Sequence, residues 1–119
     1  MIVALDFDGT MCDYSFPIIP ETLWEDVVDW IKEGIRRGHT IKIYTCRSEE
    51  YWPQIKELLN KHGLDLSIND MEDSWGTAKY KMFADIYIDD HSPWFPGRDW
   101  IKRTDWFNLE FMVNRRTNI

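Results

Sequence analysis

The sequence has few cysteines and no long apolar run, and both absences narrow the class of protein. Its two cysteines, Cys12 and Cys46, provide no disulfide framework. No apolar stretch approaches the roughly 18 residues of a membrane-spanning helix. The chain also does not open with a basic segment followed by an apolar one, as a secretory leader does. We therefore expect no membrane partner and a reducing, cytoplasmic location.

Positive charge is scarce as well. The 119 residues include 14 Lys and Arg against 21 Asp and Glu, which gives a formal net charge of −7. Proteins that bind a nucleic-acid backbone do so with cations, so this balance disfavours a nucleic-acid partner and remains compatible with a small phosphorylated substrate. Repeats, linkers and low-complexity tracts are absent too, and 44% of residues are hydrophobic. The sequence therefore predicts one domain over residues 1–119.

Apolar periodicity predicts strands that alternate with helices. Residues 2–5 are all apolar and are followed by Asp6, which is typical of a buried parallel strand. Further strands are predicted at 40–45, 64–69 and 84–88, and helices at 21–37, 51–62, 77–83 and over most of 93–119. This order favours a three-layer α/β/α sandwich around a Rossmann-like parallel sheet. Residues 11–20 contain two prolines and are predicted to form a loop that covers the pocket as a flap.

Polar residues follow three of the predicted strands. They are Asp6 and Asp8, then Thr45 and Arg47, then Asp89 and Asp90. Because the carboxyl ends of parallel strands meet at one edge, we expect these residues to lie together. Carboxylate oxygens suit Mg²⁺, and no Cys and His cluster competes as a zinc site. A lysine, Lys79 or Lys81, precedes the last strand and completes the groups that phosphoryl transfer needs.

The order of these motifs resembles that of phosphatases of the haloacid dehalogenase (HAD) superfamily. Asp6-Phe7-Asp8-Gly9-Thr10 is similar to the first family motif, and Thr45, a later lysine and Asp89-Asp90 are similar to the other three. The sequences at 43–47, 84–90 and 95–97 look like those of small capless (C0-type) members. No insertion between the motifs is large enough for a cap domain. The resemblance implies a HAD-like fold without a cap and Mg²⁺-dependent phosphomonoester hydrolysis.

The resemblance also implies the catalytic roles. Asp6 would be the nucleophile that forms an aspartyl-phosphate, and it would contact the metal through one oxygen. Asp8 would protonate the leaving alcohol and later activate water, and its backbone carbonyl would also contact the metal. The substrate would be a small phosphorylated metabolite or nucleotide, reached through an open site.

Other residues would bind the phosphate and the metal. The phosphate set is Thr45, the backbone amide of Phe7, Lys81 and Arg47. Lys81 is preferred to Lys79 because its position, four residues before Asp85, matches the capless relatives better. Arg47 could instead be a solvated loop cation. Asp89 would complete the metal ligands, with Asp90 beside it or sharing the role.

Residues near the later motifs are candidates for the substrate rim. Trp75 and Trp94 lie in predicted loops, where an aromatic face could stack on a substrate ring or simply pack at the rim. His91 directly follows the acidic pair and could contact the substrate or be incidental.

Three other functions use the same residues. A receiver-like signalling domain also gathers aspartates, a threonine and a lysine around Mg²⁺, although in a different order along the chain. A HAD scaffold could be kept as a binding module with weak chemistry. A phosphatase for nucleic-acid ends is the alternative within the same enzyme class, and the net charge speaks against it.

Overall fold

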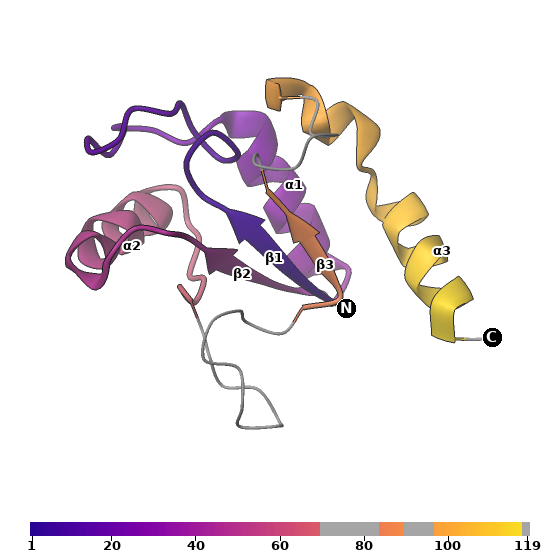
Figure 1. Cartoon of the computed structure of the whole chain (residues 1–119). Coiled ribbons are helices and arrows are strands. Elements are labelled where there is room, and N and C mark those ends of the chain that lie inside the picture. The colour runs from indigo at the N-terminus through magenta and orange to yellow at the C-terminus, as the bar shows by residue number, and fades with distance from the viewer. Residues whose placement is uncertain (70–83, 90–96, 118–119) are drawn as a thin grey trace.

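The computed structural model describes residues 1–69, 84–89 and 97–117, and its centre is a parallel sheet (Figure 1). The strands β1 (Ile2–Asp6), β2 (Thr40–Tyr44) and β3 (Ile86–Ile88) are arranged in the order β2-β1-β3. The pairing of β1 with β2 runs from Ile2 opposite Thr40 to Asp6 opposite Tyr44. Val3, Ala4 and Leu5 are all buried, as a central strand requires. The predicted α/β fold with a parallel sheet is confirmed.

Helix α1 (Glu25–Arg36) connects β1 to β2 and packs its apolar face inward. Val27, Val28 and Ile31 are buried on that face. The prediction that this helix begins at residue 21 was wrong, because Trp24 has an extended backbone with φ −66° and ψ 127°. The Trp24 N–H donates to the Met11 carbonyl (2.9 Å) instead of opening a helical turn. The predicted end is confirmed by Gly38, whose φ of 90° lies in the left-handed region.

The second predicted helix forms as a 3₁₀ turn, η1 (Glu49–Tyr51), followed by helix α2 (Trp52–Lys61). Pro53 lies in the first turn of α2, where its missing N–H costs no hydrogen bond. Ile55, Leu58 and Leu59 are buried against the sheet side of the molecule. This part of the prediction is confirmed.

The prediction of a full strand at residues 64–69 was wrong. The segment pairs with β2 at a single parallel bridge, Ile43 opposite Ile68, although its apolar residues are buried as alternation predicts. The backbone limits the pairing at the end of the segment, because Asn69 has a φ of 46°, which ends the extended conformation. The bonds to Ile43 of β2 involve Ser67 and Asn69, and the Leu66 carbonyl accepts a hydrogen bond from the Lys56 ammonium instead. The segment therefore pairs with the outer side of β2 at one residue only.

The predicted helical character of the C-terminal region is confirmed in its described part. A 3₁₀ helix, η2 (Gly97–Arg103), precedes helix α3 (Trp106–Thr117), which lies at the opposite end of the molecule from α2 (Figure 1). The Trp106 ring stacks on Trp30 with centroids 4.2 Å apart. A Cβ on Gly34 would lie 2.1 Å from the Trp106 ring, so this contact requires glycine. The C-terminal region is thus part of the core.

The predicted helix at 77–83 lies outside the described residues. None of the helices within the described ranges combines the length and the apolar character that crossing a bilayer requires.

Candidate functional site

The carboxyl ends of the three strands meet at one edge of the sheet. Asp6 ends β1, Thr45 follows β2, and Asp89 follows β3. The register places Tyr44 beside Asp6 and Ile88 beside Leu5, so Thr45 and Asp89 lie on either side of Asp6. The strand arrows of Figure 1 point toward this common edge. The structure therefore brings together the described members of the predicted site.

The pKa of the Tyr44 hydroxyl is raised by burial and by acidic groups at this edge. Burial is the larger cause, and electrostatic interactions with Cys46, Asp89 and Asp6 raise the pKa further. Carboxylates from two strands therefore act on the same group. Their joint field favours a cation at this position.

The residues after β1 form a tight turn that brings Asp8 back toward the edge. The Met11 N–H donates to the Phe7 carbonyl (3.0 Å), and Gly9 adopts a φ of 75° that glycine tolerates without strain. The Phe7 side chain is buried in the core, so only its backbone is available for the predicted phosphate contact. Burial raises the pKa of the Cys12 thiol to about 12, and the charge of Asp8 adds to the increase. Cys12 is therefore a protonated packing residue.

Thr45 is held by Asn69, a residue that the sequence did not indicate. The Thr45 N–H donates to Asn69 Oδ1 (2.8 Å), and Asn69 Nδ2 donates to the Thr45 carbonyl (2.8 Å). Thr45 Oγ1 accepts the Arg47 N–H at 3.1 Å. The available signal was an asparagine at the end of an alternating apolar and polar segment, because asparagine tolerates the left-handed backbone that Asn69 adopts.

Arg47 forms a two-point ion pair with Asp8. Its Nε donates to Asp8 Oδ2 and its Nη2 to Asp8 Oδ1, both at 2.8 Å. The Arg47 side chain is 1% exposed and that of Asp8 is 13% exposed. The hydrogen bond with Asp8 raises the pKa of the Arg47 guanidinium despite the opposing effect of burial. This arrangement fixes the carboxylate of Asp8 in one orientation.

Arg47 also binds the predicted flap, residues 11–20. Nη1 donates to the Pro17 carbonyl (2.9 Å), and Nη2 donates to the Ile18 carbonyl (3.1 Å). The guanidinium lies against the neighbouring rings of Phe16 and Tyr51, at 4.9 and 5.0 Å from their centroids. The alternative of a solvated loop cation was therefore wrong. The predicted contact between Arg47 and phosphate would require some of these bonds to break.

Two carboxylates at the edge have the chemistry that Mg²⁺ requires. Asp6 and Asp89 supply hard oxygen donors from neighbouring strands, and Mg²⁺ is commonly held by one or two carboxylates, water and a substrate phosphate. The carboxylate of Asp8 is bound by Arg47. Within the described ranges, no group of three or more His, Cys, Asp and Glu side chains could hold a metal ion. The donors thus fit the minimal protein contribution to a magnesium site.

The remaining predicted site residues lie outside the described residues. They are Lys81 and its alternative Lys79, Asp90, His91, Trp75 and Trp94. Their predicted roles stay predictions.

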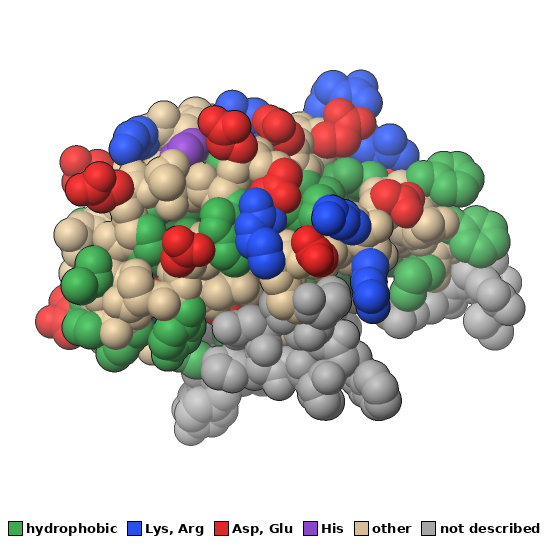
Figure 2. Space-filling model, turned by 90° about the horizontal axis from the view of Figure 1, so that it is seen from above, with side chains coloured by type: hydrophobic (Ala, Val, Ile, Leu, Met, Phe, Trp, Pro, Cys, Tyr) green, Lys and Arg blue, Asp and Glu red, His purple; other side chains and the backbone are tan. Residues whose placement is uncertain are grey.

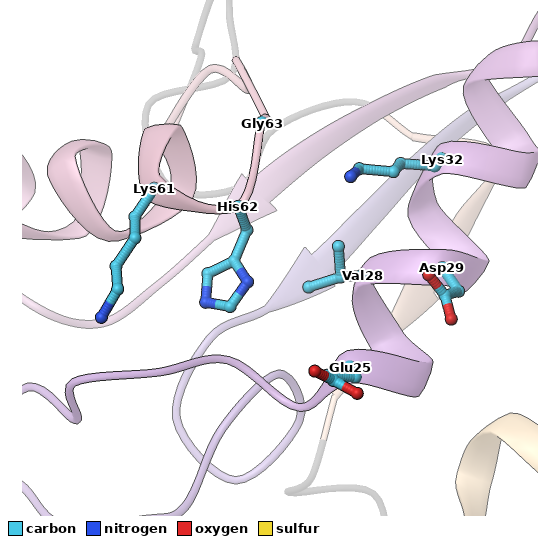
Figure 3. Close-up of a pocket in the computed structure, with 7 residues that line it drawn as sticks. All are labelled: Glu25, Val28, Asp29, Lys32, Lys61, His62 and Gly63. Carbon is cyan, nitrogen blue, oxygen red and sulfur yellow. The ribbon is translucent and has the colours of Figure 1, made fainter.

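A groove of about 580 Å³ lies elsewhere, between α1 and the end of α2. Figure 3 shows the His62 ring pointing into the space beside Val28. His62 Nε2 accepts the Leu23 N–H at 3.2 Å and so fixes the segment that precedes α1. None of the predicted site residues lines this groove. The groove lies between structural elements and is separate from the candidate site.

Comparison with known proteins gives one likeness in fold. No protein-family model matches the chain, and no curated protein matches it. Among solved structures, a conserved protein from Bacteroides thetaiotaomicron is similar, with a TM-score of 0.70 at 24% identity. The match covers 98% of this chain and 91% of that chain. At this identity, the likeness concerns the fold alone.

Proposed function

We propose that this protein is a capless, HAD-type phosphatase that hydrolyses small phosphomonoesters with Mg²⁺. The proposal includes the finer fold class, a three-layer α/β/α sandwich around a Rossmann-like sheet. One observation carries it: Asp6, Thr45 and Asp89 lie at the same edge of a parallel sheet. Their order along the chain is that of the family motifs.

In the first step, an Asp6 oxygen attacks the phosphorus atom of the substrate. The new bond is between Asp6 and phosphorus, and the bond to the alcohol oxygen breaks. Asp8 gives its proton to that oxygen, so the alcohol leaves neutral. Thr45 and the Phe7 backbone amide would hydrogen-bond the phosphoryl oxygens, while Lys81 would neutralise their charge.

In the second step, water attacks the aspartyl-phosphate and Asp8 takes a proton from the water. Inorganic phosphate leaves and Asp6 is regenerated. The proton that Asp8 takes from the water is the one that it gives to the leaving alcohol in the next turnover. Mg²⁺, held by Asp6 and Asp89 with Asp90 beside them, would supply charge neutralisation for the phosphoryl oxygens.

The decisive test is Asp6→Asn, which keeps the size of the side chain and removes the nucleophilic charge. We expect Mg²⁺-dependent hydrolysis of p-nitrophenyl phosphate to fall at least about 1,000-fold, because covalent catalysis is lost. Asp65→Asn is the control, since the Asp65 side chain is almost fully exposed. Retained turnover in Asp6→Asn would refute the nucleophile assignment.

A substrate screen separates the related functions. It compares sugar phosphates, nucleotides and phosphate-ended oligonucleotides, with and without Mg²⁺. Preferred hydrolysis of oligonucleotide ends would favour the nucleic-acid alternative. A phosphoaspartate that persists for minutes after treatment with acetyl phosphate, without turnover, would favour a receiver-like domain.

A further inference from the structure

The tip of the flap, residues 14–18, is attached to the rest of the molecule mainly through backbone carbonyls, whereas Met11 and Cys12 at its base are buried in the core. The large side chains of the tip, Tyr14, Phe16 and Ile18, are all exposed and contribute little burial. Figure 2 views the molecule from above and shows exposed hydrophobic side chains toward both ends of the visible face, with charged side chains of both signs between them. The turn at 15–18 closes on itself, because the Ile18 N–H donates to the Ser15 carbonyl at 2.9 Å. The flap therefore depends on partners beneath it.

Arg47 is the partner beneath the tip of the flap. Its guanidinium binds the Pro17 and Ile18 carbonyls, and its charge is balanced by Asp8. A buried guanidinium without a carboxylate would be left with neutral carbonyls alone, which is unfavourable. The attachment of the flap thus depends on Asp8 even though the link between them passes through Arg47.

We propose that Arg47 is a positioning residue that couples the flap to Asp8. This inference rests on the proposed function, in which Asp8 transfers protons. The fork of the guanidinium fixes the orientation of the Asp8 carboxylate, and its other hydrogens hold the flap closed over that carboxylate. Movement of the flap therefore changes the position of the proton-transferring group. Arg47 acts on the reaction through Asp8 and does not itself bind the phosphate.

Hydrogen exchange tests the coupling without turnover. We expect Asp8→Asn to speed amide exchange in a peptide covering residues 13–18 about tenfold, because the buried Arg47 loses its counterion and releases the flap. Arg47→Lys should do the same, since an ammonium has no planar fork. Asp65→Asn, on an exposed segment, should leave this exchange unchanged.

Steady-state kinetics tests the effect on the reaction. Phe16→Ala removes a ring that lies over Arg47, and we expect kcat for p-nitrophenyl phosphate to fall about tenfold while KM changes less than about twofold. Arg47→Lys should lower kcat in the same way, and Arg47→Met should lower it further. Phe107→Ala, at an exposed phenylalanine of α3, is the matched control and should keep full activity.

Two results would overturn the inference. Flap exchange that is unchanged in Asp8→Asn would show that the flap does not depend on the ion pair. A tenfold higher KM with an unchanged kcat in Arg47→Lys would make Arg47 a phosphate ligand. A wild-type protein without phosphatase activity would refute the proposed function, and the exchange result would still decide whether flap and Asp8 are coupled.

Discussion

Two arginine–aspartate pairs in the described part of the chain have similar bond lengths but different surroundings. Arg47 binds Asp8 through two bonds of 2.8 Å, and Arg98 binds Asp26 through bonds of 2.8 and 2.6 Å. Both guanidinium groups also lie against aromatic rings, Arg98 at 4.1 Å from the Trp24 centroid. The side chains of the first pair are 1% and 13% exposed, and those of the second pair are 44% and 50% exposed.

This comparison predicts that burial, more than bond length, sets the energetic importance of the two ion pairs. Arg47 and Asp8 contact each other and the flap instead of water, so removal of one partner leaves a largely buried charge without its counterion. The pair between α1 and η2 stays hydrated whether or not it forms, and its side chains lose entropy when they pair. Mutations of the four residues should therefore give unequal effects.

The largest effect is expected for Arg47→Met. The buried Asp8 carboxylate loses its partner, and the free energy of unfolding should fall by about 3–5 kcal/mol. Urea denaturation followed by circular dichroism measures the loss. The double variant Asp8→Asn with Arg47→Met should recover part of it, because no charge is then left unpaired. A loss below about 1 kcal/mol would mean that burial does not distinguish the two pairs.

A smaller effect is expected for Asn69→Ala. Asn69 is an uncharged residue of the same region that holds the Thr45 backbone through its side-chain amide. The change removes two hydrogen bonds of 2.8 Å to the Thr45 backbone, and we expect a loss of about 1–3 kcal/mol. Thermal unfolding is the measurement. Asn60→Ala, at an exposed position of α2, serves as the control and should change stability by less than about 0.5 kcal/mol. Equal effects of the two changes would contradict this role of Asn69.

For Arg98→Met, we expect a loss of at most about 1 kcal/mol, because the pair is half-exposed. High salt should reduce the difference from wild type further, whereas it should affect the Arg47→Met difference much less. Urea denaturation at low and high salt tests this. A salt-independent loss above about 2 kcal/mol would place Arg98 with Arg47 and remove the contrast.

The smallest effect concerns the pH dependence of the exposed pair. The hydrogen bond from Arg98 lowers the pKa of Asp26 below its ordinary value of 3.8. A carboxyl with a lowered pKa stabilises the fold above its ordinary pKa, and this contribution disappears as the pH falls through the lower folded value. The stability difference between wild type and Arg98→Met should therefore be present at neutral pH and vanish in acid. A constant difference across that range would exclude the ion pair as its cause.

Sequence patterns predicted the edge of the sheet because they are local. The apolar run before Asp6 and the strand before Thr45 each indicate a buried strand, and parallel strands end together by geometry. The pair of Arg47 with Asp8 was not predictable in this way. These residues are 39 positions apart, and their contact depends on the path of the flap, which has no periodic pattern.

The two errors in the predicted secondary structure, at residues 64–69 and at the start of α1, also reflect the local nature of sequence patterns. Residues 64–69 alternate as a strand does, but they pair with β2 at one bridge, and the turned backbone of Asn69 ends the extended conformation. The start of α1 was placed four residues too early because Leu23 belongs to its apolar stripe, although the Leu23 N–H is bonded to His62. The apolar pattern records neither the turned backbone of Asn69 nor the bond between the Leu23 N–H and His62.

The central position of β1 also has a consequence for biosynthesis. Both neighbours of β1 come later in the chain, β2 at residues 40–44 and β3 at 86–88. During translation, Asp6 emerges long before the strands that place Thr45 and Asp89 beside it. One hydrogen-bonding edge of β1 stays unpaired until Ile88 has left the ribosome, and unpaired edges attract other strands. The segment with the proposed nucleophile is therefore the part of the nascent chain that most needs protection.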